Sequence, residues 1–143
     1  MTITPGKKYL IDTNILIYAQ DRKSKNCEDA SNILKQLNEE KFQGYIALQN
    51  LLEYSAVLTK LYKYPKSNVV VDLKIFISNP KITILHPSEK TTSVFLSLMK
   101  NDLKLYVYDL YLVAYMKTYG IDAIITDDED FKEIKGIEVI NPF

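Results

Sequence analysis

Residues that build several common kinds of site are scarce in this chain. It contains one cysteine, Cys27, which excludes an internal disulfide and favours a reducing compartment. It contains one histidine, His86, and Cys27 lies among polar residues, so a Cys–His nucleophilic site is not favoured. Lys and Arg together number 18, as do Asp and Glu, so the formal net charge is zero. Net charge therefore does not predict a nucleic-acid partner, and any basic surface has to be local.

Long apolar runs and linkers are also missing. No apolar stretch approaches the roughly 18 residues that a membrane-spanning helix needs, and the N-terminus lacks a signal-peptide pattern. We therefore expect a cytoplasmic protein with no membrane partner. Hydrophobic residues make up 47% of the chain, which indicates a globular protein. Because no Gly-, Ser- or Pro-rich linker and no repeat divides the chain, residues 1–143 are expected to form one domain.

Apolar runs typical of buried strands alternate with segments of helical periodicity. We expect strands at 9–11, 45–49, 81–85, 122–126 and 137–141. We expect helices at 15–19, 29–38, 51–63, 68–77, 88–100 and 105–119, and a short helix within 128–134. The β-branched residues of 68–77 favour a strand, but its apolar residues repeat at helical spacing, and we prefer a helix. The alternation predicts an α/β domain, a three-layer α/β/α sandwich with a mainly parallel central sheet.

Capping residues stand near several expected helix ends. Thr13 or Asn14 is available as the N-cap of the first helix, and Asn50 as the N-cap of the third. Ser88 can begin the fifth helix, and Gly120 can end the sixth. These residues predict where the helices begin and end.

Acidic residues follow two of the expected strands. Asp12 ends the apolar run Tyr9–Ile11, and Thr126-Asp127-Asp128 ends a late strand. In parallel sheets, sites form at the carboxyl ends of the strands. A carboxylate between two apolar runs is costly to bury unless something offsets its desolvation. We therefore expect these acids to meet at one edge of the sheet.

Two further acids interrupt apolar faces of expected helices. Glu53 shares a helical face with Ala56 and Val57, three and four residues on. Asp109 stands in the middle of an apolar stripe made by Leu105, Leu112, Val113 and Met116. A lone buried Asp would have a raised pKa or would destabilise the fold.

Each acid also has a purely structural explanation. Asp12 could cap the following helix, and Asp109 could be the N-cap of a shorter one. Glu53 could lie at the edge of its stripe with its carboxylate in water. The remaining acids could be turn and cap residues: Asp127, Asp128 and Asp130. Because all of them fall at strand ends or on inward stripes, a carboxylate cluster explains them together. Oxygen ligands favour Mg²⁺ or Mn²⁺ over Zn²⁺, and such ions suit phosphoryl transfer.

The segments that carry these acids resemble the motifs of the PIN domain, the nuclease fold of VapC-type toxins. The segment "YLIDTNILIY" resembles its first motif, and "ALQNLLEYSAVL" resembles the second. The run from Val107 to the end of the chain resembles the third and fourth motifs together, including an Asn-Pro pair near its end. Each motif alone is common, but four in order along nearly the whole chain are specific.

The resemblance implies four metal-binding catalytic acids: Asp12, Glu53, Asp109 and Asp128. The family pattern places the fourth acid two residues after Thr126, which selects Asp128, and Asp127 is the alternative. Asn14 and Thr126 would support the site by hydrogen bonds. Tyrosines at 111 and 115 depart from the family pattern, in which smaller residues are usual.

The implied activity is Mg²⁺- or Mn²⁺-dependent hydrolysis of RNA phosphodiester bonds, with one or two ions and 5′-phosphate products. A cognate antitoxin and a homodimer are the implied partners. The alternatives are a PIN nuclease of RNA processing or repair that is not a toxin, and a non-catalytic nucleic-acid-binding PIN domain. A haloacid-dehalogenase-type phosphatase is disfavoured because it needs a second Asp where this chain has Asn14.

Two basic groups are candidates for RNA binding, because cations contact phosphates and aromatic rings stack on bases. The first group follows the first helix and consists of Arg22, Lys23 and Lys25. The second lies near residue 63 and consists of Lys60, Lys63 and Lys66, interleaved with Tyr62 and Tyr64. Each group could instead be an ordinary solvated face.

Overall fold

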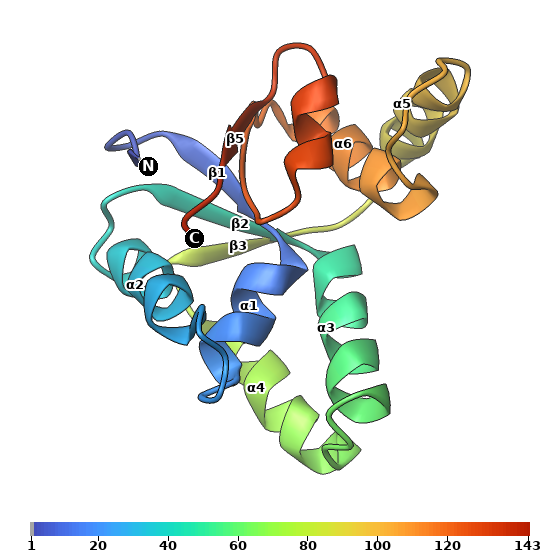
Figure 1. Ribbon diagram of the computed structural model, residues 1–143. Coiled ribbons are helices and arrows are strands. Elements are labelled where there is room, and N and C mark those ends of the chain that lie inside the picture. The colour runs from blue at the N-terminus through green and yellow to red at the C-terminus, as the bar shows by residue number, and fades with distance from the viewer. Residues whose placement is uncertain (1) are drawn as a thin grey trace.

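A parallel β-sheet forms the centre of the molecule. The computed structural model describes residues 2–143, and in this range the sheet has five strands in the order β3-β2-β1-β4-β5. The strands are β1 (Lys8–Ile11), β2 (Gln43–Ala47), β3 (Ile82–Leu85), β4 (Ala123–Ile125) and β5 (Glu138–Ile140). All four pairings are parallel. The expectation of a mainly parallel sheet is therefore confirmed, and β1 lies in the middle with β4 beside it (Figure 1).

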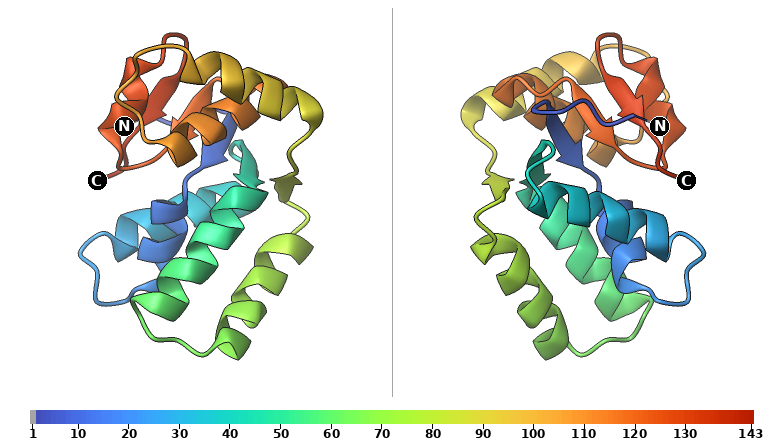
Figure 2. Two further views of the ribbon diagram at one scale, coloured as in Figure 1. Left: turned by 90° about the vertical axis from the view of Figure 1, so that its right-hand side faces the viewer. Right: turned by 90° about the vertical axis from the view of Figure 1, so that its left-hand side faces the viewer.

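Helices cover both faces of the sheet, as expected for a three-layer α/β/α sandwich. One face carries α1 (Thr13–Gln20), α2 (Cys27–Asn38), α3 (Leu48–Lys60) and α4 (Lys66–Ser78). The other carries α5 (Glu89–Met99), α6 (Val107–Tyr119) and the 3₁₀ helix η1 (Glu129–Glu133). Figure 2 shows α5 and α6 on the side of the sheet away from α1, α3 and α4. Within residues 2–143, none of the helices combines the length and apolarity needed to cross a membrane.

Alternating side chains of the central strand supply the cores of both layers. Tyr9 and Ile11 pack with the residues of α1 to α4, whereas Leu10 packs with those of α5 and α6. All three are completely buried. This period of two is what a strand requires when both faces are covered. The first apolar run of the sequence therefore fixes β1 as the centre of the fold.

Several element boundaries differ from the expected ones. Thr13 and Asn14 are not N-caps, because α1 starts at Thr13, two residues earlier than expected, and Asp12 is its cap. Asn50 was expected to begin α3, but the helix starts at Leu48 and the Asn50 side chain instead accepts a hydrogen bond from the Ala47 backbone amide, at 3.0 Å. Asp and Asn side chains can accept a hydrogen bond from a backbone amide either at the N-cap or within the first turn of a helix. The presence of such a residue therefore does not locate the first residue of the helix.

Other boundaries agree with the sequence. Ser88 caps α5, and Gly120 ends α6 with φ of 66°, a left-handed conformation that glycine adopts without strain. The ambiguous segment 68–77 is helical, within α4. Val69 is the only fully buried residue of α4, which explains the weak apolar pattern of that segment.

Candidate active site

The ends of β1 and β4 bring the first and last acidic segments together. The Asp12 backbone amide donates to the Ile125 carbonyl at 3.0 Å, so Asp12 lies beside Thr126. Asp12 follows β1 and Thr126 follows β4, both at the carboxyl edge of the sheet. The expected meeting of these two segments is confirmed, and it follows from the direct pairing of β1 with β4.

Asp12 is the most enclosed of the acids, with 6% of its surface exposed. Its Oδ1 accepts from the Thr13 amide and its Oδ2 from the Thr126 hydroxyl, each at 2.7 Å. Asn14 and Asn50 lie at the limit of hydrogen-bonding distance from this carboxylate, at 3.4 and 3.5 Å. Burial raises the Asp12 pKa to about 7, although the Thr126 and Thr13 hydrogen bonds oppose the shift. Asp12 therefore caps α1 and also lies in the acidic site.

Glu53 projects from the second turn of α3 toward Asp12 and is held by neutral donors. Its Oε2 accepts from the Thr13 hydroxyl and its Oε1 from the Gln49 side-chain amide, each at 2.8 Å. Thr13 in turn accepts from the Asn50 amide at 3.0 Å. Gln49 also donates to the Tyr108 backbone carbonyl at 2.8 Å, which joins α3 to the first turn of α6. These contacts fix the Glu53 carboxylate without neutralising it.

Asp109 lies in the first turn of α6 and is half-buried. Its expected apolar companions on the stripe are all buried: Leu105, Leu112, Val113 and Met116. The helix starts at Val107, so Asp109 is not an N-cap. Burial raises the Asp109 pKa to about 6, with smaller contributions from Asp128 and Glu53. The negative charges of α3, α6 and the segment after β4 therefore act on one another.

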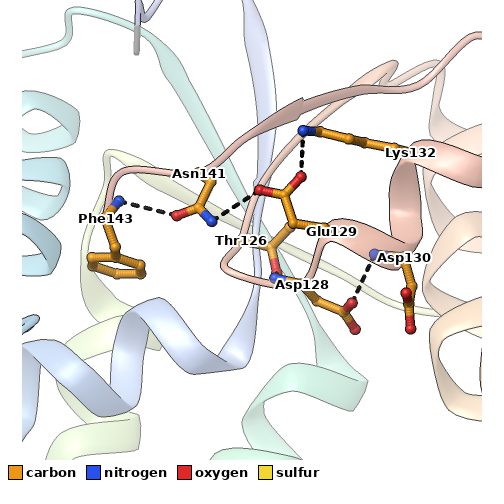
Figure 3. A network of polar contacts seen from close by, with 7 residues as sticks. All are labelled: Thr126, Asp128, Glu129, Asp130, Lys132, Asn141 and Phe143. Atoms are coloured by element: carbon orange, nitrogen blue, oxygen red, sulfur yellow. Dashed lines mark hydrogen bonds and ion pairs between the residues drawn. The ribbon is translucent and has the colours of Figure 1, made fainter.

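Asp127 and Asp128 have different surroundings although they are adjacent. Asp127 Oδ1 accepts from the Asn14 amide and Oδ2 from the Tyr18 hydroxyl, each at 2.6 Å. The Asp128 backbone amide donates to the Thr126 hydroxyl at 3.0 Å, and its Oδ1 caps η1 by accepting from the Asp130 amide at 2.9 Å. Figure 3 shows the Asp128 contact with Asp130. The expected turn and cap role of these residues is thus present together with their place in the acidic site.

One pocket of about 620 Å³ collects the expected acids. Its lining includes Asp12, Glu53, Asp109, Asp127 and Asp128, together with Thr13, Asn14, Ile17, Val57, Tyr106 and Tyr108. Within residues 2–143, none of the lining residues is a Lys, Arg or His. The five carboxylates repel one another, and no Lys, Arg or His among the described lining residues offsets the repulsion.

The donor set of this pocket fits a hard divalent cation. All of its charged side chains are carboxylates, and the buried Asn14 Oδ1 lacks a hydrogen-bond partner within residues 2–143. In the same range, no three acidic, His or Cys side chains stand close enough together to hold one metal ion. Mg²⁺ keeps several waters and is usually bound by only one or two carboxylates, so an open ring of acids suits it.

The structure does not place the basic groups in this pocket. Arg22, Lys23 and Lys25 are exposed and lie beyond the far end of α1, a helix that rises about 12 Å from Asp12 to Gln20. The second group lies at the end of α3 and the start of α4. A hydrogen bond of 3.0 Å from the Tyr62 hydroxyl to Asp21 joins the two segments. The two basic groups, separate in the sequence, therefore lie near each other.

Three polar residues of the site were not expected from the sequence. The sequence patterns indicate no site role for Tyr18 or Gln49, and only a capping role for Asn50. Tyr18 stands four residues after Asn14, and Gln49 four residues before Glu53, so each shares a helical face with a residue of the site. This spacing is the signal that identifies them. For Asn50 the sequence contains no such signal, because its contact with Thr13 depends on how α1 and α3 pack.

Comparisons with known proteins identify the family and the fold of the chain. The family model for the PIN domain matches residues 9–137. A search of curated proteins found no match. Among solved structures, the chain is similar to Mycobacterium tuberculosis VapC20, described as a toxin that cleaves the sarcin-ricin loop, with a TM-score of 0.73 and 17% identity over 93% of this chain and 99% of that one.

Two complexes are similar as well. VapBC2 from Rickettsia felis, bound to a DNA fragment from its promoter, has a TM-score of 0.69 and 23% identity over 92% of this chain and 96% of that one. A toxin–antitoxin complex from Klebsiella pneumoniae has a TM-score of 0.66 and 23% identity over 94% of this chain and 98% of that one. At these identities the likeness concerns the fold.

Proposed function

Because the chain belongs to the PIN domain family, we propose that it is a Mg²⁺- or Mn²⁺-dependent endoribonuclease and the toxin of a VapBC-type toxin–antitoxin pair. The observation that carries the proposal is the pocket in which carboxylates from the end of β1, α3, α6 and the segment after β4 meet, with no Lys, Arg or His of residues 2–143 in its lining. Such a pocket repels RNA by itself. A divalent ion converts it into a site that attracts a phosphate.

Asp12, Glu53, Asp109 and Asp128 are the residues that would hold the metal, and they would be the catalytic acids. Asn14 and Thr126 support them, since both are hydrogen-bonded to the Asp12 carboxylate and to each other. The bound ion would stabilise negative charge on the phosphate and lower the pKa of water. The chain's own contribution is to fix the acids in position, because each hydrogen bond around Asp12 and Glu53 restricts a carboxylate to one orientation.

The test is cleavage of a mixed RNA pool by the purified protein with Mg²⁺ or Mn²⁺, with and without EDTA, beside single-stranded DNA. We expect metal-dependent cleavage of RNA that leaves 5′-phosphates. Cleavage in EDTA would contradict the metal dependence, and failure of the folded, metal-loaded protein to cut either polymer would contradict the nuclease. Cleavage without growth arrest on expression in bacteria would indicate RNA processing or repair rather than a toxin.

The basic residues near the Tyr62–Asp21 contact are expected to bind the RNA backbone. Replacing Arg22, Lys23 and Lys25 together by alanine should raise KM for RNA by about tenfold and weaken its salt dependence, with little change in kcat, because phosphate contacts act mainly on affinity. The control replaces three exposed cations in and after α5 by alanine: Lys90, Lys100 and Lys104. An unchanged KM and salt slope in the triple variant would show that these residues are only a solvated face. Steady-state cleavage at several salt concentrations measures both.

The proposal includes an antitoxin partner and a homodimer, supported by an exposed apolar surface beside the acidic pocket. A pocket of about 380 Å³ is lined mainly by apolar side chains of α3, α5 and α6, and Leu52 and Tyr108 at its border are 64% and 60% exposed. Apolar surface of this kind commonly marks a protein–protein contact. We expect Leu52→Glu to convert a dimer into a monomer in light scattering, whereas Leu61→Glu should not, because Leu61 is exposed directly after α3 and lies outside the lining of this pocket. An unchanged dimer in Leu52→Glu would place the interface elsewhere.

A further inference from the structure

The carboxylate of Asp127 is fully engaged by α1. Asn14 donates to one oxygen and Tyr18 to the other, each at 2.6 Å. The two donors are four residues apart and therefore lie on the same face of the helix. Asp128, by contrast, uses its Oδ1 for the η1 cap and raises the pKa of Asp109 through its charge. The side chains of the two neighbouring acids thus have different partners. The Asp127 carboxylate is hydrogen-bonded to α1, whereas the Asp128 charge raises the pKa of Asp109.

Tyr18 is itself held in place by the segment that follows β5. The Phe143 ring packs edge-to-face on the Tyr18 ring, with centroids 5.2 Å apart. The Phe143 amide donates to Asn141 Oδ1 at 3.0 Å, and Asn141 Nδ2 donates to Glu129 at 3.1 Å (Figure 3). Glu129 is the first residue of η1, directly after Asp128. The acidic turn is therefore tied at one end to α1 through Asp127, and at the other to the segment after β5 through Glu129.

We infer that Tyr18 is a positioning residue of the acidic site: its hydroxyl binds Asp127, and this contact sets the turn 126–128 so that Asp128, rather than Asp127, faces the metal. The inference rests on the proposed metal site. Asn14 and Thr126 complete the link, because Asn14 also donates to the Thr126 hydroxyl and that hydroxyl accepts from the Asp128 amide, each at 3.0 Å. Loss of the Tyr18 hydroxyl frees one Asp127 oxygen and releases the turn.

The experiment compares Tyr18→Phe, Asp127→Ala and the double variant, with Asp128→Ala as the reference for a lost ligand. Tyr18→Phe keeps the ring that packs on Phe143 and removes only the hydroxyl. Mn²⁺ affinity is measured by calorimetry, and hydrogen exchange is measured at the Asp128 and Asp130 amides in metal-free protein. We expect Tyr18→Phe to weaken Mn²⁺ binding about 10–100-fold, the usual effect of a residue that orients a ligand. Exchange at the two amides should quicken about fivefold.

The double variant separates positioning from general stabilisation. If Tyr18 acts through Asp127, adding Tyr18→Phe to Asp127→Ala changes neither the Mn²⁺ affinity nor the exchange rates further. The matched control is Tyr54→Phe, which removes a hydroxyl that donates to Asp72 at 2.8 Å, between α3 and α4. That variant should leave Mn²⁺ affinity and the two amides unchanged.

Three results would overturn the inference: unchanged amide exchange in Tyr18→Phe, additive effects of the two substitutions, or loss of Mn²⁺ binding in Asp127→Ala as complete as in Asp128→Ala. These results are distinct from failure of the proposed function. A protein that binds Mn²⁺ but cuts no RNA would contradict the nuclease and leave the Tyr18 contact supported by affinity and exchange. If the wild type binds no Mn²⁺, Asp128 faces no metal and the inference fails together with the metal site.

Discussion

Replacing Asp12 with asparagine is expected to lower the rate of RNA cleavage by about 10³-fold or more, and replacing Asp109 with asparagine is expected to do the same. Loss of a residue that only orients a metal ligand lowers affinity or activity by about 10–100-fold, so loss of a ligand carboxylate should do more. Both acids line the pocket, and both have raised pKa values because of burial among other carboxylates. Single-turnover cleavage at saturating Mn²⁺ is the measurement.

The structure also predicts an order among the acids. Glu53→Gln should have a smaller effect than Asp109→Asn, because both Glu53 oxygens are already engaged by Thr13 and Gln49. Asp109 has no hydrogen bond to its carboxylate within residues 2–143, so its charge is the more available to an ion. Asp130→Asn is the matched control: this Asp is exposed, lies two residues from Asp128 and is outside the pocket lining. Its activity should stay within about threefold of the wild type.

Two outcomes would contradict this prediction. If Asp12→Asn and Asp109→Asn are folded and cleave RNA at the wild-type rate, these two carboxylates are not required for the reaction. Equal losses in Asp109→Asn and Asp130→Asn would show that overall negative charge matters rather than ligand position. Circular dichroism of each variant guards against unfolding as the cause of a lost rate.

The fold could be predicted from the sequence because apolar strand segments alternate with helical segments along the chain, and this alternation gives the three layers. Tyr9, Leu10 and Ile11 form a continuous apolar run, which is typical of a strand buried on both faces, and β1 is the central strand. The positions of Asp12 and Thr126 at one edge then followed from the parallel direction of the strands. Asp109 could be located because it interrupts an otherwise apolar stripe.

The sequence could not choose between Asp127 and Asp128 by physical reasoning. Adjacent residues differ in direction only through the conformation of the turn, and that conformation depends on contacts with α1 and with Asn141. The helix starts were misplaced for a related reason. Asp12, Thr13 and Asn14 are all good capping residues, and packing rather than propensity selected Asp12. Both the turn conformation and the helix starts depend on contacts between residues far apart in the sequence, so local sequence patterns do not predict them.

In metal-free protein, the free energy of unfolding is expected to fall by up to about 4 kcal/mol between pH 5 and pH 8. Burial raises the Asp12 pKa from 3.8 to about 7 and the Asp109 pKa from 3.8 to about 6. A carboxyl with a raised pKa in the folded state binds more protons there than in the unfolded chain. Its contribution to stability is therefore present below about pH 4 and is lost as the pH rises through 6 and 7. Half-buried Asp109 contributes less than Asp12, because solvent screens its charge.

Within residues 2–143, Asp12 and Asp109 are the groups whose shifted pKa values lie between pH 5 and pH 8. The lowered pKa of Glu129, caused by Lys132, acts at lower pH, and the raised pKa of Lys7, caused by Glu138, acts at higher pH. Urea unfolding in EDTA at each pH measures the effect. Asp12→Asn should flatten the profile, because it removes the larger of the two contributions. A wild-type profile that is flat or rises with pH would show that the Asp12 carboxylate is not desolvated.

A divalent metal ion should restore the unfolding free energy that the metal-free protein loses at high pH. At pH 8 both acids are ionised and repel each other, and a cation bound only to the folded state stabilises it by about 2.7 kcal/mol at 100 times its Kd. We therefore expect Mn²⁺ to raise the urea midpoint much more at pH 8 than at pH 5, where protons compete for the same oxygens. Equal gains at both pH values, or an equal gain in Asp109→Asn, would place the bound ion outside the acidic pocket. The acidic pocket therefore has two effects. Its carboxylates destabilise the metal-free fold at neutral pH, and the same carboxylates bind the ion that the proposed reaction needs.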